Sequence, residues 1–169
     1  EGGLSHASEL VSLIKNEFPD IGCGVAGYPE AHPEAHSLET DVDHLMEKVD
    51  CGADFVTTQL FFENADFYWF RDLCRARGVT QPILSGLLPV ISLPQIKRTM
   101  ELSQVSFPAA LEQKLKEAGE KGPEAEKAGI RWAVDQIEDL LANGVPGIHL
   151  YILNRPKTAL DSELEDCIH

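Results

Sequence analysis

The sequence predicts an α/β protein built around a parallel sheet. Four apolar segments alternate along the chain with amphipathic segments of helical periodicity, and such alternation is typical of right-handed βαβ units. The apolar segments are continuous, as expected for strands that are covered on both faces. Two architectures fit this pattern, namely a small open doubly wound sheet and half of an eight-stranded barrel.

The length bears on the choice between these architectures. The chain has 169 residues, whereas a complete (β/α)₈ barrel usually needs roughly 250. If the chain is a barrel protein, it is therefore about four βα units of one.

The first elements follow from apolar periodicity and from capping residues. A first helix is indicated by apolar residues at helical spacing, which are Leu4, Ala7, Val11, Ile14 and Phe18. The small-residue segment 21–28 predicts the first strand. Ser37 can cap a second helix, which we expect to run to about Asp50 and to end at Gly52.

The middle of the chain continues the alternation of strands and helices. Segment 55–62 predicts the second strand, and Asn64 can cap a third helix that ends at Gly78. Segment 82–89 predicts the third strand. Ser92 then begins a further helix, in whose first turn Pro94 is tolerated.

The last part departs from the simple alternation. It predicts an extra helix over 107–118, a polar linker or helix junction over 117–127, a long helix with its apolar stripe over 130–141, and a fourth strand over 147–153. The loop 154–156 follows, and we expect weak helical character in the polar tail from Lys157.

Charge and composition exclude several classes of function. The net charge is −14 and no basic run is present, which argues against nucleic acid as a partner. No apolar stretch approaches the roughly 20 residues that span a bilayer, and no signal-peptide pattern is visible. The four cysteines form no CxxC pair, so we expect free thiols in a reducing cytoplasm.

The segment 27–36 holds the densest group of functional side chains. It places a Tyr, two His and two Glu directly after a buried strand, at the end of the sheet where α/β proteins bind ligands. His32 and His36 could suggest a metal pair, but Pro33 between them does not stack them as a helix would, and cofactor contact is the better interpretation. Taken alone, a rigid surface turn with solvated histidines explains the segment equally well.

Single polar residues follow other strands. Gln59 can donate and accept hydrogen bonds to a flat heteroaromatic ring, or be satisfied by neighbouring backbone. Arg155 can clamp a carboxylate, or form a surface salt bridge. On spacing alone, Asp41, Lys48 and Gln95 are ordinary helical residues.

Taken together, four motifs resemble the methylenetetrahydrofolate reductase family. They lie in register from about Leu4 to Arg155 and occupy 27–35, 52–62, 86–90 and 151–155. The resemblance implies that residues 1–169 are the C-terminal half of a single flavin-binding (β/α)₈ barrel. It also implies that the catalytic general acid lies in an N-terminal half, so that this chain contains no catalytic acid and would be inactive alone.

The resemblance implies a reaction and a set of site residues. FAD passes a hydride from NADH or NADPH to 5,10-methylenetetrahydrofolate in two half-reactions, which yields 5-methyltetrahydrofolate for one-carbon and methionine metabolism; a homo-oligomer is also expected. The implied FAD contacts are Tyr28, His32, Ala35, Asp41, His44 and Lys48. The implied substrate contacts are Gln59, Gln95, Tyr151 and Arg155, and no metal site is implied.

Two other classes of function stay open. An aldolase-type barrel lyase would need a Schiff-base Lys on a strand or a phosphate-binding Gly loop, and neither is visible. A non-catalytic interaction module derived from a half-barrel is the main alternative, because the general acid is missing. The sequence does not decide between NADH and NADPH.

Overall fold

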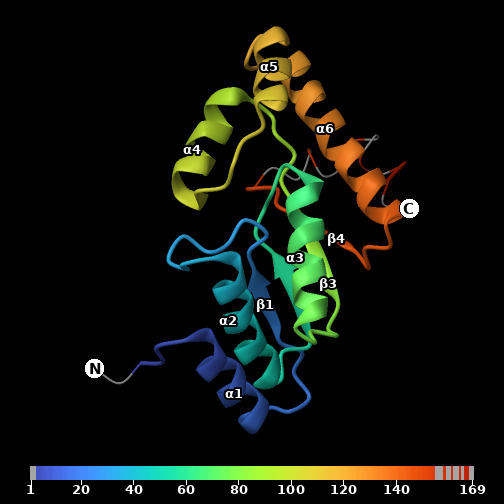
Figure 1. The fold of residues 1–169 in the computed structure, drawn as a ribbon. Coiled ribbons are helices and arrows are strands. Elements are labelled where there is room, and N and C mark those ends of the chain that lie inside the picture. Colours follow the sequence, from blue (N-terminus) through green and yellow to red (C-terminus); the bar gives the residue numbers. More distant parts are fainter. Residues whose placement is uncertain (1–2, 155–157, 159–160, 162–163, 165, 168–169) are drawn as a thin grey trace. The chain divides into compact units, whose positions relative to one another are not determined.

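The computed structural model describes residues 3–154, 158, 161, 164 and 166–167, and within residues 3–154 the chain alternates helices with short strands (Figure 1). The helices are α1 (Ala7–Glu17), α2 (Leu38–Asp50), α3 (Asn64–Ala76), α4 (Leu93–Ser103), α5 (Ala109–Glu117) and α6 (Pro123–Ala142). The strands are β1 (Gly24–Gly27), β2 (Phe55–Thr58), β3 (Ile83–Leu87) and β4 (Ile148–Leu150).

The four strands are parallel and keep their chain order in the sheet, β1-β2-β3-β4. A doubly wound sheet reverses its strand order at a switch point, whereas consecutive strands of a barrel stay neighbours. The predicted α/β class is therefore confirmed, and the strand order is that of four consecutive βα units of a barrel.

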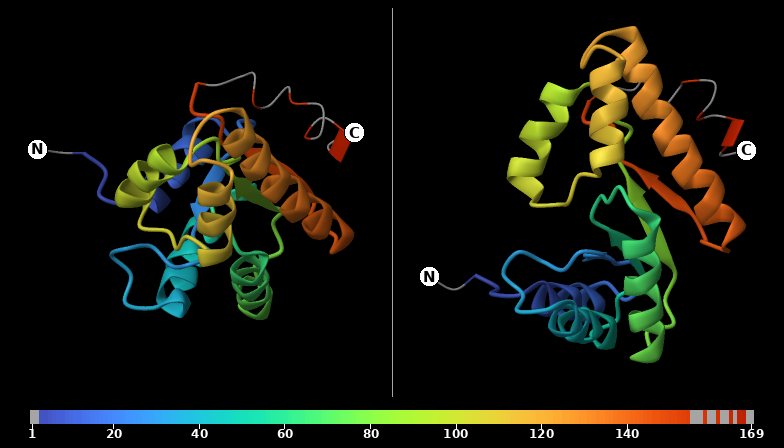
Figure 2. Two further views of the ribbon diagram at one scale, coloured as in Figure 1. Left: turned by 90° about the horizontal axis from the view of Figure 1, so that it is seen from above. Right: turned by 45° about the horizontal axis from the view of Figure 1, so that its top comes forward.

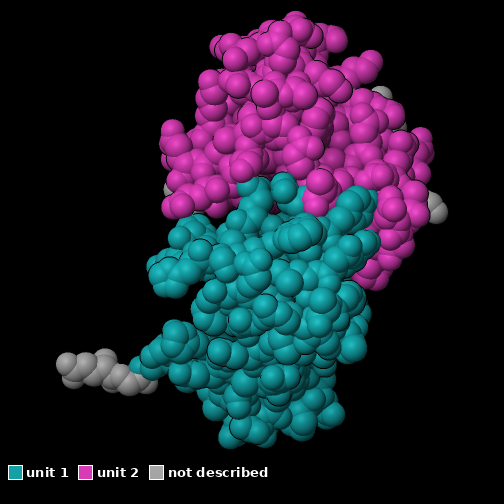
Figure 3. All heavy atoms as spheres, in the orientation of Figure 1, with its two compact units in different colours: residues 1–59, 66–84 teal, residues 60–65, 85–169 magenta. Residues whose placement is uncertain are grey.

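The chain divides into two compact units, coloured separately in Figure 3. Unit 1 comprises residues 1–59 and 66–84, and unit 2 comprises residues 60–65 and 85–169. In unit 1, α1 packs beside α2, and α2 packs against β1 (Figure 2).

Unit 2 has its own apolar core, in which α5 packs along α6 (Figure 2). Its fully or nearly fully buried members include Phe62, Leu93, Ile96, Leu111 and Leu115. Gly129 lets α6 approach the chain after β3 very closely, because a Cβ atom there would lie 1.8 Å from the carbonyl oxygen of Val90.

Most helix ends agree with the predicted ones. Ser37 is the N-cap of α2, and its side chain accepts the Thr40 N–H at 3.3 Å. Ser92 precedes α4, with Pro94 in the first turn. Gly144 follows α6 with a φ of +74°, which is the conformation that favours glycine after a helix.

The predicted boundaries are wrong in three respects. The strands are shorter than the predicted apolar segments, because an apolar pattern indicates burial and not strand pairing. Leu60 and Phe62, for example, are buried although they lie beyond the end of β2. Asn64 is the first residue of α3 and not the residue before it. α6 begins at Pro123, so the junction is shorter than the predicted 117–127.

Of the helices in the described part of the chain, none combines the length and the hydropathy that crossing a bilayer requires.

Candidate functional site

The loop after β1 begins at a glycine that the packing requires. A Cβ atom on Gly27 would lie 2.6 Å from the ring of Phe70 and 2.9 Å from a methyl group of Val56. The loop then folds back on itself through backbone hydrogen bonds from Ala31 N to Tyr28 O (3.1 Å) and from Ala35 N to His32 O (2.8 Å). These bonds hold Tyr28 to Ala35 in a compact turn before α2.

Asp41 in the first turns of α2 fixes the middle of this loop. The carboxylate is buried and accepts the His32 backbone N–H at 3.2 Å. The rings of Tyr28 and His32 meet edge to face, with centroids 4.7 Å apart. His32 Nδ1 accepts the Glu34 N–H at 3.2 Å, so a neutral His32 carries its proton on Nε2.

Burial sets the electrostatics of this loop and helix. It raises the pKa of Asp41, although the His32 N–H and the Lys48 ammonium act in the opposite direction. Burial, with the Asp41 charge added to it, raises the pKa of Tyr28. Burial lowers the pKa of Lys48, whose Nζ donates to the carbonyl oxygen of Ala26 on β1 at 2.7 Å.

One cavity of about 510 Å³ in unit 1 brings these groups together. All six predicted FAD contacts line it, namely Tyr28, His32, Ala35, Asp41, His44 and Lys48. They come from the loop after β1 and from one face of α2. The cavity therefore brings together six predicted residues that lie up to twenty positions apart in the chain.

Other residues of the cavity were missed at the level of sequence. These are His6, Ala7 and Ser8 at the start of α1, together with Glu47. Glu34 also lines the cavity and belongs to the segment 27–36 that the sequence indicated. In the described part of the protein, the N-cap residue His6 makes no side-chain capping hydrogen bond to α1, and helix N-termini attract anions. A His in the first turn of the predicted helix was the available signal, but nothing local in the sequence shows that α1 begins beside the loop after β1.

The predicted substrate contacts are distributed over both units. Gln59 follows β2 in unit 1, and its backbone N–H donates to Gly27 O at 2.7 Å. Gln95 on α4 and Tyr151 after β4 belong to unit 2. Arg155 lies outside the described residues.

The two described contacts of unit 2 have distinct surroundings. The side-chain oxygen of Gln95 is buried without a hydrogen-bond partner in the described part of the protein. The Tyr151 backbone N–H donates to Leu87 O at 2.8 Å, which aligns the residue with the end of β3. The His149 ring lies edge-on to Tyr151, with centroids 4.7 Å apart.

Within the described ranges, no group of three or more His, Cys, Asp or Glu side chains is placed to hold a metal ion.

Comparison with known proteins decides the family. The family model described as methylenetetrahydrofolate reductase matches residues 1–162. The chain belongs to this reductase family. Among curated members, it is 37% identical over 150 residues to 5,10-methylenetetrahydrofolate reductase of Escherichia coli, covering 89% of this chain and 50% of that protein.

Two further members of the reductase family show identities in the same range. The probable methylenetetrahydrofolate reductase (NADPH) of Caenorhabditis elegans is 39% identical over 88% of this chain and 23% of its own length. Methylenetetrahydrofolate reductase (NADH) 1 of Arabidopsis thaliana is 34% identical over 95% of this chain and 29% of its own length. The chain thus spans half or less of each of these three reductases.

A solved structure shares the fold of this reductase-family chain. It is an uncharacterized protein from Clostridium thermocellum that binds two copies of 5-methyl-5,6,7,8-tetrahydrofolic acid. The likeness has a TM-score of 0.63 and 16% sequence identity, and it covers 95% of this chain and 57% of that one. At this identity the likeness concerns the fold alone.

Proposed function

We propose that the protein containing this chain reduces 5,10-methylenetetrahydrofolate to 5-methyltetrahydrofolate, with FAD as cofactor and NADH or NADPH as hydride donor. The observation that carries the proposal is the cavity of about 510 Å³ that all six expected FAD contacts line. Membership of the reductase family supports the reaction. In this proposal residues 1–169 are the C-terminal half of one (β/α)₈ domain, and the general acid lies in the other half.

The residues of the cavity fit a dinucleotide cofactor. Its volume falls within the roughly 300–1,000 Å³ of small-molecule sites. An anionic diphosphate needs positive charge and N–H donors, and the cavity offers the Lys48 ammonium and the N-terminus of α1 beside it. Positive groups at the site are important for binding an anion, because the chain as a whole has a net charge of −14.

The residues that line the cavity have different roles in the proposed holoenzyme. Lys48 would pair with the diphosphate, and Tyr28 and His32 would hold the adjoining part of the cofactor. Asp41 would keep the loop in place through its bond from the His32 N–H. When bound, FAD would supply the redox chemistry, accepting a hydride from the nicotinamide and passing it to the folate in separate half-reactions.

The substrate contacts would orient two ligands in turn. A Gln amide donates and accepts hydrogen bonds at once, as the edge of a pterin and a nicotinamide carboxamide both require. We therefore assign Gln59 to both ligands, which would occupy the same place alternately. Gln95 and Tyr151 would contact the folate, and Arg155 would face its glutamyl carboxylates.

The proposed location is the cytoplasm, where one-carbon metabolism would supply the folate. All four cysteines are free thiols, which suits a reducing compartment.

The visible absorbance of the purified full-length protein tests the proposed reaction. We expect a bound-flavin spectrum that bleaches with NADH or NADPH and recovers when methylenetetrahydrofolate is added. The donor that bleaches the flavin at lower concentration identifies the physiological nicotinamide. A colourless protein that takes up no added FAD would contradict the proposal and favour a non-catalytic interaction module.

A further inference from the structure

Three polar side chains of α6 form a row on one face of the helix. Trp132, Gln136 and Asp139 are spaced four and three residues apart, which places them above one another on consecutive turns. The proposed reaction assigns no role to any of them. All three hydrogen-bond to the short segment Leu60–Ala65, which is part of unit 2 like α6 itself.

The Asn64 amide is held on both its oxygen and its nitrogen. Its oxygen accepts the Gln136 side-chain N–H at 3.1 Å. Its Nδ2 donates to the backbone oxygen of Gln136 at 3.1 Å and to the Asp139 carboxylate at 2.7 Å. Because Gln136 is only 8% exposed, loss of its side chain would leave the Asn64 oxygen without its donor in a poorly hydrated place.

Trp132 secures the same segment two residues earlier. Its indole N–H donates to the backbone oxygen of Phe62 at 3.1 Å. The Lys114 ammonium on α5 lies 5.1 Å from the centre of the indole ring, and this contact keeps the ring in place. Hydrogen bonds from α6 therefore hold the segment both at Phe62 and at Asn64.

This anchored segment starts at the residue after Gln59. The other side of Gln59 is held independently, because its backbone N–H bonds to Gly27 O at 2.7 Å. We propose that Trp132 and Gln136 are positioning residues for the proposed reductase reaction. They fix the position of the backbone that follows Gln59 and, through it, the position of the Gln59 amide relative to the folate and the nicotinamide. This inference rests on the role proposed for Gln59.

The expected loss of rate follows from how strongly a reaction depends on the orientation of the reacting groups. A displacement of about 1 Å at a reacting centre can slow a reaction about 10²-fold. Without the bonds from α6, the segment after Gln59 keeps its apolar packing but loses the hydrogen bonds that hold Phe62 and Asn64 to the helix. Both half-reactions should suffer alike, since the same Gln59 amide serves both ligands.

The test uses the full-length flavoprotein and stopped-flow measurement of each half-reaction. We expect Gln136→Leu to slow flavin reduction by NAD(P)H and flavin reoxidation by methylenetetrahydrofolate by about 10- to 100-fold each. Trp132→Phe, which keeps an aromatic ring and removes one hydrogen bond, should slow both by a smaller factor. Asp135→Ala is the matched control, because Asp135 is the exposed neighbour of Gln136 and pairs with Arg131; it should change neither rate.

A double-mutant comparison separates positioning from general stability. In a Gln59→Ala background, Gln136→Leu and Trp132→Phe should slow neither half-reaction further, because the side chain that they position is absent. Equal slowing in the wild-type and the Gln59→Ala backgrounds would overturn the inference, as would wild-type rates in both α6 variants. If Gln136→Leu yields no folded flavoprotein, the Trp132→Phe comparison decides.

The same data distinguish this inference from the proposed function. Wild-type rates in Gln59→Ala itself would refute the site assignment on which the inference rests. A slow Gln59→Ala variant beside unaffected α6 variants would refute the inference alone.

Discussion

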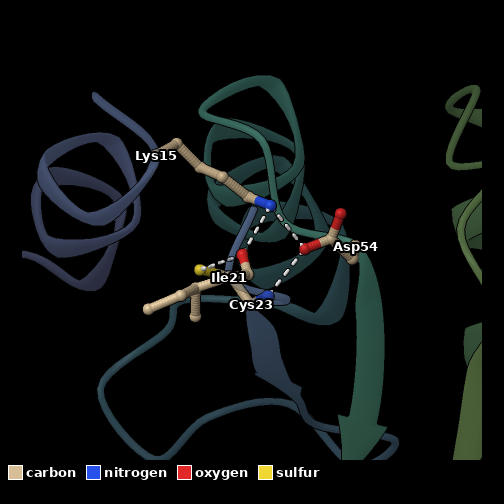
Figure 4. Close-up of polar contacts among 4 residues, drawn as sticks. All are labelled: Lys15, Ile21, Cys23 and Asp54. Carbon is tan, nitrogen blue, oxygen red and sulfur yellow. Dashed lines mark hydrogen bonds and ion pairs between the residues drawn. The ribbon is translucent and has the colours of Figure 1, made fainter. Parts of the chain in front are cut away.

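The Lys15 ammonium lies 2.7 Å from the Asp54 carboxylate and joins α1 to the turn before β2 (Figure 4). The same ammonium donates to Ile21 O at 2.9 Å, and the same carboxylate oxygen accepts the Cys23 N–H at 2.6 Å. Helix α1, the approach to β1 and the approach to β2 therefore meet at one ion pair. This pair lies at the amino ends of the strands, away from the proposed site at their carboxyl ends.

We expect Asp54→Asn to lower the midpoint of thermal unfolding by a few degrees at pH 7. The bonds from the Lys15 ammonium and the Cys23 N–H lower the pKa of Asp54. A lowered carboxyl pKa adds stability above the ordinary value of about 3.9, and that stability is lost as the pH falls through the lowered value. Circular dichroism melts of the full-length protein between pH 2 and 7 measure the difference.

The pH dependence separates the ion pair from a packing effect. The difference in melting temperature between wild type and Asp54→Asn should shrink to nothing at the acid end. A constant difference over the whole range would show that the Asp54 charge is unimportant.

Gly129→Ala should destabilise unit 2 by about 1–3 kcal/mol, the usual range for overpacking. Alanine gains about 1 kcal/mol of helix propensity over glycine, but the added Cβ atom would lie 1.8 Å from a backbone oxygen that cannot rotate away. Chemical denaturation measures the change. Gly22→Ala is the matched control, because its Cβ atom would meet nothing nearer than 3.9 Å; equal effects at both glycines would contradict the close approach of α6.

Ser37→Ala should lower the free energy of unfolding by about 1 kcal/mol, the typical effect of losing an N-cap side chain. The Ser37 hydroxyl accepts the Thr40 N–H at the start of α2, and α2 carries Asp41 and Lys48. Ser92→Ala is a matched control at the N-cap of α4, where the side chain makes no capping hydrogen bond. Similar losses in the two variants, measured by denaturation, would show that capping is not what Ser37 contributes.

Lys48→Met should weaken FAD binding about 10- to 150-fold, the equivalent of a charge-assisted hydrogen bond of about 1.5–3 kcal/mol. Fluorescence titration of the flavin-free full-length protein measures this affinity. Lys121→Met makes the same change at an exposed position outside the cavity and should leave the affinity unchanged. Equal loss in both variants would point to overall charge and not to the cavity.

The affinity for FAD should also fall at alkaline pH through Lys48. Burial lowers the pKa of Lys48, so its ammonium loses the proton at a lower pH than an exposed lysine does. Binding of the anionic cofactor therefore weakens as the pH rises through that lowered value. Lys48→Met should lack this decrease, and a decrease that persists in the variant would assign it to another group.

Local patterns predicted the elements well and their ends less well. Helical spacing of apolar residues identified α1, and Ser37 marked the start of α2, because capping and amphipathic periodicity act within a few residues. The end of β2 was missed, since Leu60 and Phe62 are as apolar as the strand before them. Their burial comes from the core of unit 2, which no local pattern reveals.

The features of the site likewise fall into those that the sequence indicates and those that only the tertiary structure reveals. The sequence alone indicated the βα alternation, which depends on residue identity and spacing, and the resemblance to the reductase family, which in turn implied the six FAD contacts. Tertiary structure alone decided that the start of α1 completes their cavity and that Asn64 pairs with Gln136. Those contacts join residues far apart in the chain, and only the packing of helices on the sheet determines which of them meet.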